Sequence, residues 1–182
     1  MRLLMVGPWR ATAMRRHIDW AVESGIEVCV ADYVARNDRT VPVGFRLARL
    51  RPRQSAYIHG AKSHRRSELS RYRSGLRLRH IAAAFQPDLV HSYLLGEYTD
   101  PCLQARLRPL VVSVWGSLNR VLTAETTPKD RRWLRRLRNG AHTLLVENPN
   151  MLRALTARSP APLHVECFPI GIDGSLFPSW LC

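Results

Sequence analysis

Hydrophobic positions along the chain follow two spacings that alternate from one end to the other. Short apolar runs rich in β-branched residues predict strands, whereas apolar residues three or four positions apart predict helices. The predicted strands lie at residues 2–6, 26–32, within 41–50, and at 88–91, 110–114, 142–146 and 163–168. Helices are predicted at residues 12–25, 63–86, 98–107, 128–140 and 149–155. The apolar stripe of the second helix is expected to contain Leu69, Leu76, Ile81 and Phe85, and Asn148 is expected to cap the last helix.

The order of these elements predicts the fold class. The first two strands enclose one helix, which Thr12 is expected to cap and Gly25 to end. This βαβ unit requires a parallel sheet with a right-handed crossover. Because strands and helices keep alternating, we expect a single α/β domain with a doubly wound, mostly parallel, Rossmann-like sheet. Its ligands should bind outside the carboxyl ends of the strands.

Composition excludes several classes of protein. The chain has 182 residues, of which 46% are hydrophobic, 23% charged and 8% aromatic, as in ordinary globular domains and unlike disordered or collagen-like chains. No apolar run approaches the roughly 20 residues of a membrane-spanning helix, and residues 1–6 are too short for a secretory signal, so a cytoplasmic location is expected. The four cysteines form no CxxC pair, which predicts ordinary thiols and no metal site.

Positive charge is concentrated in one segment. The net charge is +14, and between residues 36 and 79 twelve arginines and one lysine face only two acidic residues, a local net of +11. Such a segment favours an anionic partner. An anionic membrane surface is the partner expected, with peripheral docking at the inner face of the membrane. The residues expected to dock are Arg65, Arg66, Arg71 and Arg73.

Four segments in register resemble one enzyme family. They are QPDLVH at 86–91, PLVVSVWGS at 109–117, GAHTLLV at 140–146 and FPIGID at 168–173, followed by Phe177. Together they resemble the N-terminal Rossmann-type half of a GT-B glycosyltransferase of the family 4 kind. The resemblance implies that residues 1–177 form that half and that residues 178–182 are a tail at the start of a linker.

The resemblance also implies an activity, because enzymes of that family consist of two halves with different roles. The first half shapes the acceptor site, and the second binds most of the nucleotide sugar through paired glutamates and a Lys or Arg. The implied function is therefore the acceptor-binding half of a retaining glycosyltransferase, with a nucleotide sugar as donor substrate and neither a permanent cofactor nor an obligatory metal. The acceptor of many relatives is lipid-linked. Without the donor-binding half, the chain is expected to be inactive.

Candidate site residues follow the predicted strands. Gly7 and Arg10 come after the first strand, where a backbone amide or a guanidinium could meet an anionic group, although a plain turn explains Gly7 equally well. His91 is expected at the carboxyl edge as a donor to a sugar hydroxyl or a phosphate oxygen, or as a structural histidine. Family relatives with Trp-Gly-Ser continue with Asp, where this chain has Leu118. The remaining candidates are Trp115, Gly116, Ser117 and Asn119.

Two other functions compete with the enzyme half. The first is a degenerate, non-catalytic module that docks on a partner glycosyltransferase or on an anionic membrane, which the replaced Asp favours. The second is nucleic-acid binding, which the charge alone suggests. Because the sequence contains no recognisable helix-turn-helix, zinc-finger or RNA-binding aromatic motif, a nucleic-acid partner is disfavoured.

Overall fold

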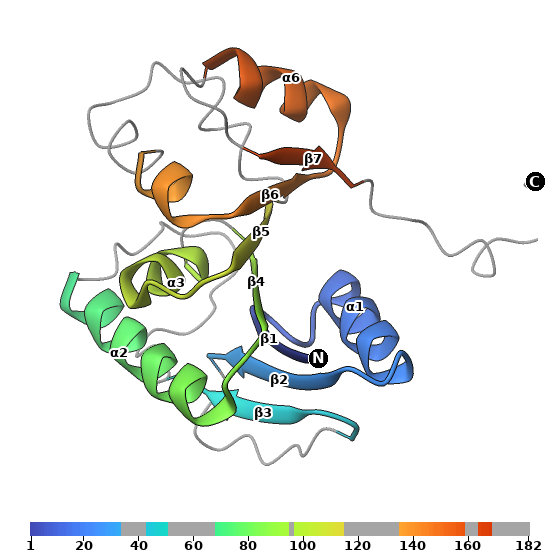
Figure 1. The fold of residues 1–182 in the computed structure, drawn as a ribbon, viewed down its shortest axis with the longest axis vertical. Helices are drawn as coiled ribbons and strands as arrows, with labels where there is room; N and C mark the ends of the chain where they lie inside the picture. Colours follow the sequence, from blue (N-terminus) through green and yellow to red (C-terminus); the bar gives the residue numbers. More distant parts are fainter. Residues whose placement is uncertain (34–42, 51–67, 95–96, 115–134, 159–163, 169–182) are drawn as a thin grey trace, which may run out of the picture.

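In the part of the chain that the structure describes, seven parallel strands form one sheet in the order β3-β2-β1-β4-β5-β6-β7 (Figure 1). The computed structural model describes residues 1–33, 43–50, 68–94, 97–114, 135–158 and 164–168. The strands are β1 (Arg2–Val6), β2 (Glu27–Asp32), β3 (Arg46–Arg49), β4 (Leu89–Tyr93), β5 (Leu110–Val114), β6 (Thr143–Val146) and β7 (Val165–Cys167). The predicted doubly wound, Rossmann-like α/β sheet is confirmed.

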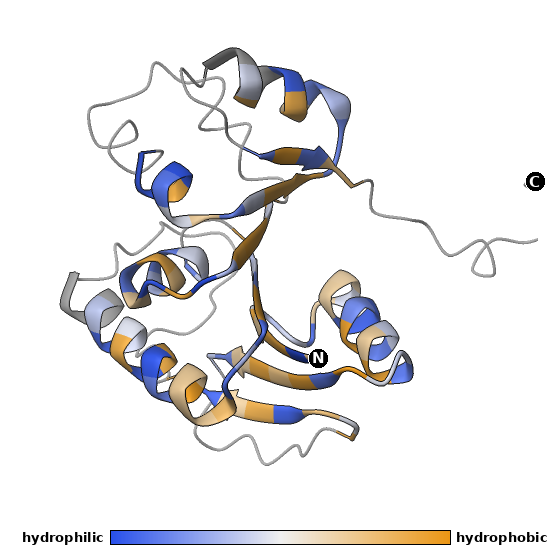
Figure 2. Cartoon of the chain, viewed as in Figure 1, coloured by the Kyte–Doolittle hydropathy of each residue, from blue (hydrophilic) through white to orange (hydrophobic). Residues whose placement is uncertain are grey.

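Helices cover both faces of the sheet. The first is α1 (Thr12–Glu23), and the others are α2 (Glu68–Phe85), α3 (Thr99–Ala105) and α6 (Pro149–Arg158), with residues 135–140 also helical. On one face α1 buries Met14 and Ile18 against β1 and β2. On the other face α2, α3 and α6 share a larger core with the strands. Strands buried on both faces are accordingly hydrophobic throughout much of their length (Figure 2).

The inward face of α2 differs from the predicted one. Leu76 was expected to be part of an apolar stripe, but it is exposed, and Ser74, Gly75 and Leu78 are buried in its place. A Cβ added to Gly75 would come within 3.2 Å of the Gln104 side chain on α3. Small residues therefore face α3 because the two helices approach closely, and this approach is a tertiary constraint that apolar spacing does not reveal.

Helix ends bear out some of the local predictions. Gly25 has a φ of +72° and ends α1 as expected, and the Asn148 side chain accepts a hydrogen bond from the Met151 amide at 3.0 Å, which caps α6. The predicted cap at Thr12 is wrong. Ala11 is the N-cap residue of α1 and makes no side-chain hydrogen bond to it, while Thr12 already lies within the helix.

The basic segment is described only in part. Arg73, Arg77 and Arg79 are exposed on α2, and Arg71 belongs to the same helix, whereas Arg65 and Arg66 lie outside the described residues. Membrane docking by these arginines stays a prediction. Among the described helices, none has the length and hydrophobicity needed to cross a bilayer. The domain boundary at residue 177 also lies outside the described residues.

Gly7 fixes how closely α1 packs on the sheet. It follows β1, and its amide donates to the Ala31 carbonyl at 3.1 Å. A Cβ built on Gly7 would lie 2.7 Å from the Met14 sulfur and 2.8 Å from the Tyr93 Cβ. The Met14 end can move, but the Tyr93 Cβ is fixed to the backbone of β4. Only glycine therefore fits at this position without a shift of the sheet or of α1.

We expect Gly7→Ala to lower the free energy of unfolding by about 1–3 kcal/mol because it overpacks a full contact. Urea denaturation of both proteins measures the difference. Thr12→Ala is the control: Thr12 is exposed and caps nothing, so its replacement should change stability by less than about 0.5 kcal/mol. A larger loss in Thr12→Ala than in Gly7→Ala would contradict this account of both residues.

Candidate functional site

The topological switch point of the sheet lies at the carboxyl ends of β1 and β4, and this edge together with the loops around it is called the crevice. The chain leaves β1 toward β2 on one side and leaves β4 toward β5 on the other, so the strand order reverses between β1 and β4, which is where doubly wound sheets bind ligands. Gly7 follows β1 here, and Leu94 follows β4 with a φ of +67°. A left-handed conformation costs a branched residue about 1–2 kcal/mol. Such strain tends to occur at functional sites, and it marks this edge of the sheet.

A buried carboxylate ties together the loops around this edge. Asp32, at the end of β2, accepts a hydrogen bond from the Trp9 amide at 3.2 Å. It also accepts one from the Tyr33 amide at 2.5 Å and one from the Tyr98 hydroxyl at 2.7 Å. These three donors belong to the segments that follow β1, β2 and β4. One side chain therefore holds three loops of the crevice in register.

The environment of Asp32 opposes its negative charge. Burial raises the pKa of this carboxyl, and the hydrogen bonds from Tyr98, Tyr33 and Trp9 lower it by a smaller amount. Nearby, the Tyr33 and Tyr98 rings are 5.3 Å apart. Because both carboxylate oxygens already accept bonds, the arrangement suits a positioning role for Asp32.

Aromatic and imidazole rings form a second cluster between α1 and β4. The His17 Nδ1 and the Tyr93 hydroxyl are hydrogen-bonded at 2.8 Å, and the His91 ring stacks on the Tyr93 ring at 4.2 Å. The His91 Nε2 is hydrogen-bonded to the Ser113 Oγ on β5 at 2.8 Å. Phe168 lies edge-on to His17 at 6.2 Å and is 54% exposed. The cluster thus runs from the buried Tyr93 to an exposed aromatic ring.

Burial keeps this cluster uncharged at neutral pH. It lowers the pKa of His17, and burial together with the neighbouring His17 lowers the pKa of His91 to about 3. Burial also raises the pKa of the Tyr93 hydroxyl. A neutral imidazole offers one donor and one acceptor, which matches a hydroxyl group better than an anion.

A cation lies at the outer rim of the crevice. The Arg10 guanidinium is exposed and sits 5.1 Å from the centre of the buried Trp9 ring, close enough for a cation–π contact. Arg10 immediately precedes the N-cap of α1, and the first turn of that helix carries no acidic residue. Both features give the rim a positive potential.

The structure describes three of the predicted site residues. Gly7 is buried under α1, Arg10 lies at the rim, and His91 lies inside β4 rather than beyond its end. The described contacts of His91 are with Ser113 and with neighbouring rings, and its role as a ligand donor stays a prediction. The other candidates, Trp115, Gly116, Ser117 and Asn119, lie outside the described residues. Among the described residues, no group of His, Cys, Asp and Glu side chains could hold a metal ion.

Sequence reasoning missed the groups that organise the crevice. Asp32 ends a predicted strand about 25 residues after Gly7, a spacing at which Rossmann folds often place an acidic residue, so its position was a usable signal. His17 and Tyr93 gave no such signal. Their contact joins residues 76 positions apart and exists only once α1 packs on β4.

Comparisons with known proteins define the class of fold. Neither the protein-family models nor the curated proteins contain a match. Among solved structures, sucrose-phosphate synthase from Thermosynechococcus elongatus matches with a TM-score of 0.69 at 14% identity, over 97% of this chain and 50% of that one. Another structure of that enzyme matches with a TM-score of 0.63 at 13% identity, over 94% of this chain and 90% of the other.

A third match comes from a different enzyme. The UDP-GlcNAc 2-epimerase from Methanocaldococcus jannaschii has a TM-score of 0.55 at 12% identity, over 92% of this chain and 45% of that one. At these identities the likeness concerns the fold. The chain has the Rossmann-like fold of one half of a GT-B structure, and it spans about half the length of the complete synthase chain.

The loss of Asp32 should destabilise the protein more than the loss of one of its partners. Asp32→Ala leaves the Trp9 amide and the Tyr98 hydroxyl without their acceptor, which should cost about 3 kcal/mol, whereas Tyr98→Phe should cost about 1–2 kcal/mol. Chemical denaturation measures both. Asp19→Ala removes a carboxylate that pairs with Arg15 on the surface of α1, and it should cost less than about 0.5 kcal/mol. Equal losses in all three variants would refute the role of Asp32 as a hub.

Acid should destabilise the protein through His91. In the unfolded chain this imidazole takes up a proton near pH 6.5, whereas in the folded protein it does so only near pH 3. The free energy of unfolding should therefore fall by about 1.4 kcal/mol per pH unit between these values. His91→Gln should remove this slope from the pH dependence of the free energy of unfolding. At pH 7 His91 is neutral in the folded protein, so the difference in stability between the two proteins at that pH measures the packing and hydrogen bonding lost with the ring. Parallel curves for the two proteins would disprove the assignment.

Proposed function

We propose that this protein is the acceptor-binding half of a glycosyltransferase that moves a sugar, with retention of configuration, from a nucleotide sugar to an acceptor hydroxyl. The observation that carries the proposal is the match of nearly the whole chain to a domain-sized part of sucrose-phosphate synthase, with a polar crevice at the sheet edge where such folds bind ligands. In this proposal a second Rossmann-like domain holds most of the nucleotide sugar.

The chemistry of the crevice supports an acceptor rather than a donor ligand. Its inner groups, His17, His91 and Tyr93, are neutral at pH 7 and hydrogen-bonded within the protein, so the interior of the edge suits uncharged sugar hydroxyls better than a phosphate. The exposed ring of Phe168 offers an apolar surface on which the C–H face of a sugar can pack. Arg10, at the rim, is the group placed to neutralise a phosphate of an approaching substrate.

A specific observation favours a second candidate, the non-catalytic docking module. Asp32 has both oxygens occupied by structural hydrogen bonds, and His91 is bonded to Ser113, so neither is set up as a general base in the described part of the chain. A module of this kind would keep the crevice as a rigid scaffold. Its partners would be a glycosyltransferase or an anionic membrane, which the exposed arginines of α2 would contact.

NMR titration of the full 182-residue chain tests the first proposal. Methyl glucoside, methyl mannoside and methyl galactoside should shift the ring signals of His17 and Phe168, and at least one of them should bind in the millimolar range. Phe168→Ala should weaken that binding at least about fivefold because it removes the apolar surface. Tyr72→Ala is the matched control, since Tyr72 is an exposed aromatic residue on α2 and should leave binding unchanged.

The other outcomes of the titration are equally informative. If UDP-glucose shifts these signals and the methyl glycosides do not, the crevice is a donor site and the proposal is wrong. If no sugar or nucleotide sugar shifts them, the docking module replaces the enzyme half as the better account.

A further inference from the structure

The outer side of α2 carries a stripe of apolar side chains. Tyr72 and Leu76 lie one turn apart and are 59% and 38% exposed. Ala83, two turns further along, is exposed on the same side of the helix. A single apolar side chain on a surface is ordinary, whereas a row of them bordered by polar groups marks an interaction surface. The stripe therefore needs an explanation.

Basic side chains border this stripe on both sides. By helical spacing, Arg79 lies along one side of it. Arg73 and Arg77 lie along the other side, with His80 next to the stripe. All four are exposed, and the sequence has no acidic residue at positions 69–87. In the described part of the chain these arginines form no ion pair, so nothing there offsets their charge.

The packing of α2 turns the stripe away from the rest of the domain. The helix lies on the face of the sheet opposite α1, at the outside of the molecule (Figure 1). Its other side is buried through Ser74 and Leu78. Gly75 faces the Gln104 side chain of α3, as described above. The stripe is thus the side of α2 that the core does not use.

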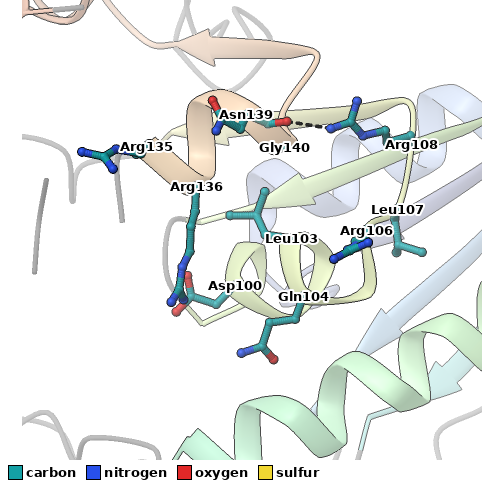
Figure 3. A pocket seen from close by; sticks show the side chains of 10 residues that line it. All are labelled: Asp100, Leu103, Gln104, Arg106, Leu107, Arg108, Arg135, Arg136, Asn139 and Gly140. Atoms are coloured by element: carbon teal, nitrogen blue, oxygen red, sulfur yellow. Dashed lines mark hydrogen bonds between the residues drawn. The ribbon is translucent and has the colours of Figure 1, made fainter. Parts of the chain in front are cut away.

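A basic cavity extends the positive surface beyond α2 (Figure 3). It has a volume of about 920 Å³, and its lining includes Gln104 and residues that precede β5 and β6 at the amino ends of these strands. Its arginines spread in different directions. The Arg136 side chain lies beside Asp100, Arg135 points away from α3, and Arg108 donates to the Asn139 carbonyl at 2.6 Å. They add positive potential to this face without converging on one ligand.

The combination of the stripe and its borders selects one kind of anionic partner. Arginines alone would suit any polyanion. Between them, Tyr72 and Leu76 suit a bilayer, because they can enter the boundary between head groups and acyl chains while the guanidiniums pair with anionic head groups. The long arginine stems allow both contacts at once. Tyrosine is also enriched at membrane–water interfaces.

We propose that the outer side of α2 binds an anionic membrane surface, with Tyr72 and Leu76 inserted and with Arg73, Arg77 and Arg79 at the level of the head groups. Such binding differs from docking by charge alone, because part of its free energy comes from apolar contacts that salt does not screen. It does not depend on what the crevice binds. The membrane surface is therefore compatible with either candidate function.

Sedimentation of the full 182-residue chain with vesicles tests the partner. Vesicles of phosphatidylcholine and phosphatidylglycerol in equal parts should bind the protein at least about tenfold more tightly than vesicles of phosphatidylcholine alone. Part of the binding to the mixed vesicles should persist in concentrated salt. Equal binding to both vesicles, or binding to neither, would overturn the proposal. Complete loss of binding in salt would overturn the role of the stripe.

Serine variants test the apolar contacts. Tyr72→Ser combined with Leu76→Ser should weaken binding to the mixed vesicles at least about tenfold. Trp20→Ser is the control, because it removes an exposed ring from α1 on the opposite face of the sheet and should leave binding unchanged. The melting temperature of the double variant should match that of the original protein, since both side chains are exposed. Unchanged vesicle binding by the double variant would refute insertion.

A second pair of variants tests the charge. Arg77→Gln should weaken binding to the mixed vesicles about fivefold, whereas Arg16→Gln, an equal loss of charge on α1, should leave it unchanged. Equal losses in these two variants would show that net charge, and not the side of α2, is responsible. Tighter binding to duplex DNA than to the mixed vesicles, unaffected by the two serines, would replace the membrane with a nucleic acid.

Discussion

The three hydrogen bonds to Asp32 are the constraint on which the crevice depends. The carboxylate draws in the Trp9 amide, the Tyr33 amide and the Tyr98 hydroxyl, and these groups belong to loops that follow three different strands. A charge this deeply buried is tolerated only when donors surround it. The loops must therefore keep their relative positions, and the rim formed by Trp9 and Arg10 is held with them.

Close backbone contacts set the distances between the layers. Gly7 lets α1 approach β4, and Gly140 lets Leu103 pack against the end of the helical residues 135–140. In both places the missing Cβ determines the spacing, because a methyl group would overlap a neighbour by several tenths of an ångström or more. The contact at Gly7 is the stricter of the two, because the Tyr93 Cβ cannot move, whereas the end of the Leu103 side chain can.

The crevice and the basic cavity differ in electrostatics because their groups differ in burial. At the carboxyl edge, burial removes charge from His17 and His91 and opposes charge on Asp32, so the interior of the crevice favours neutral hydrogen-bonding ligands. At the amino ends of β5 and β6, the exposed side chains of Arg106 and Arg136 belong to the lining of a basic cavity. One small domain thus presents chemically opposite surfaces at the two ends of its sheet.

The sequence by itself determined the parallel α/β architecture and most of its helix ends. Hydrophobic periodicity, the turn at Gly25 and the cap at Asn148 depend only on residues that are neighbours in the chain, so one sequence is enough to predict them. The glycine turn after β1 and the basic rim at Arg10 were predictable for the same reason. Only the tertiary structure decided that Leu76 faces solvent, that Thr12 caps nothing, and which side chains meet at the crevice. Contacts such as that of His17 with Tyr93 join residues far apart in the chain, and their partners depend on the distances at which the helices pack on the sheet.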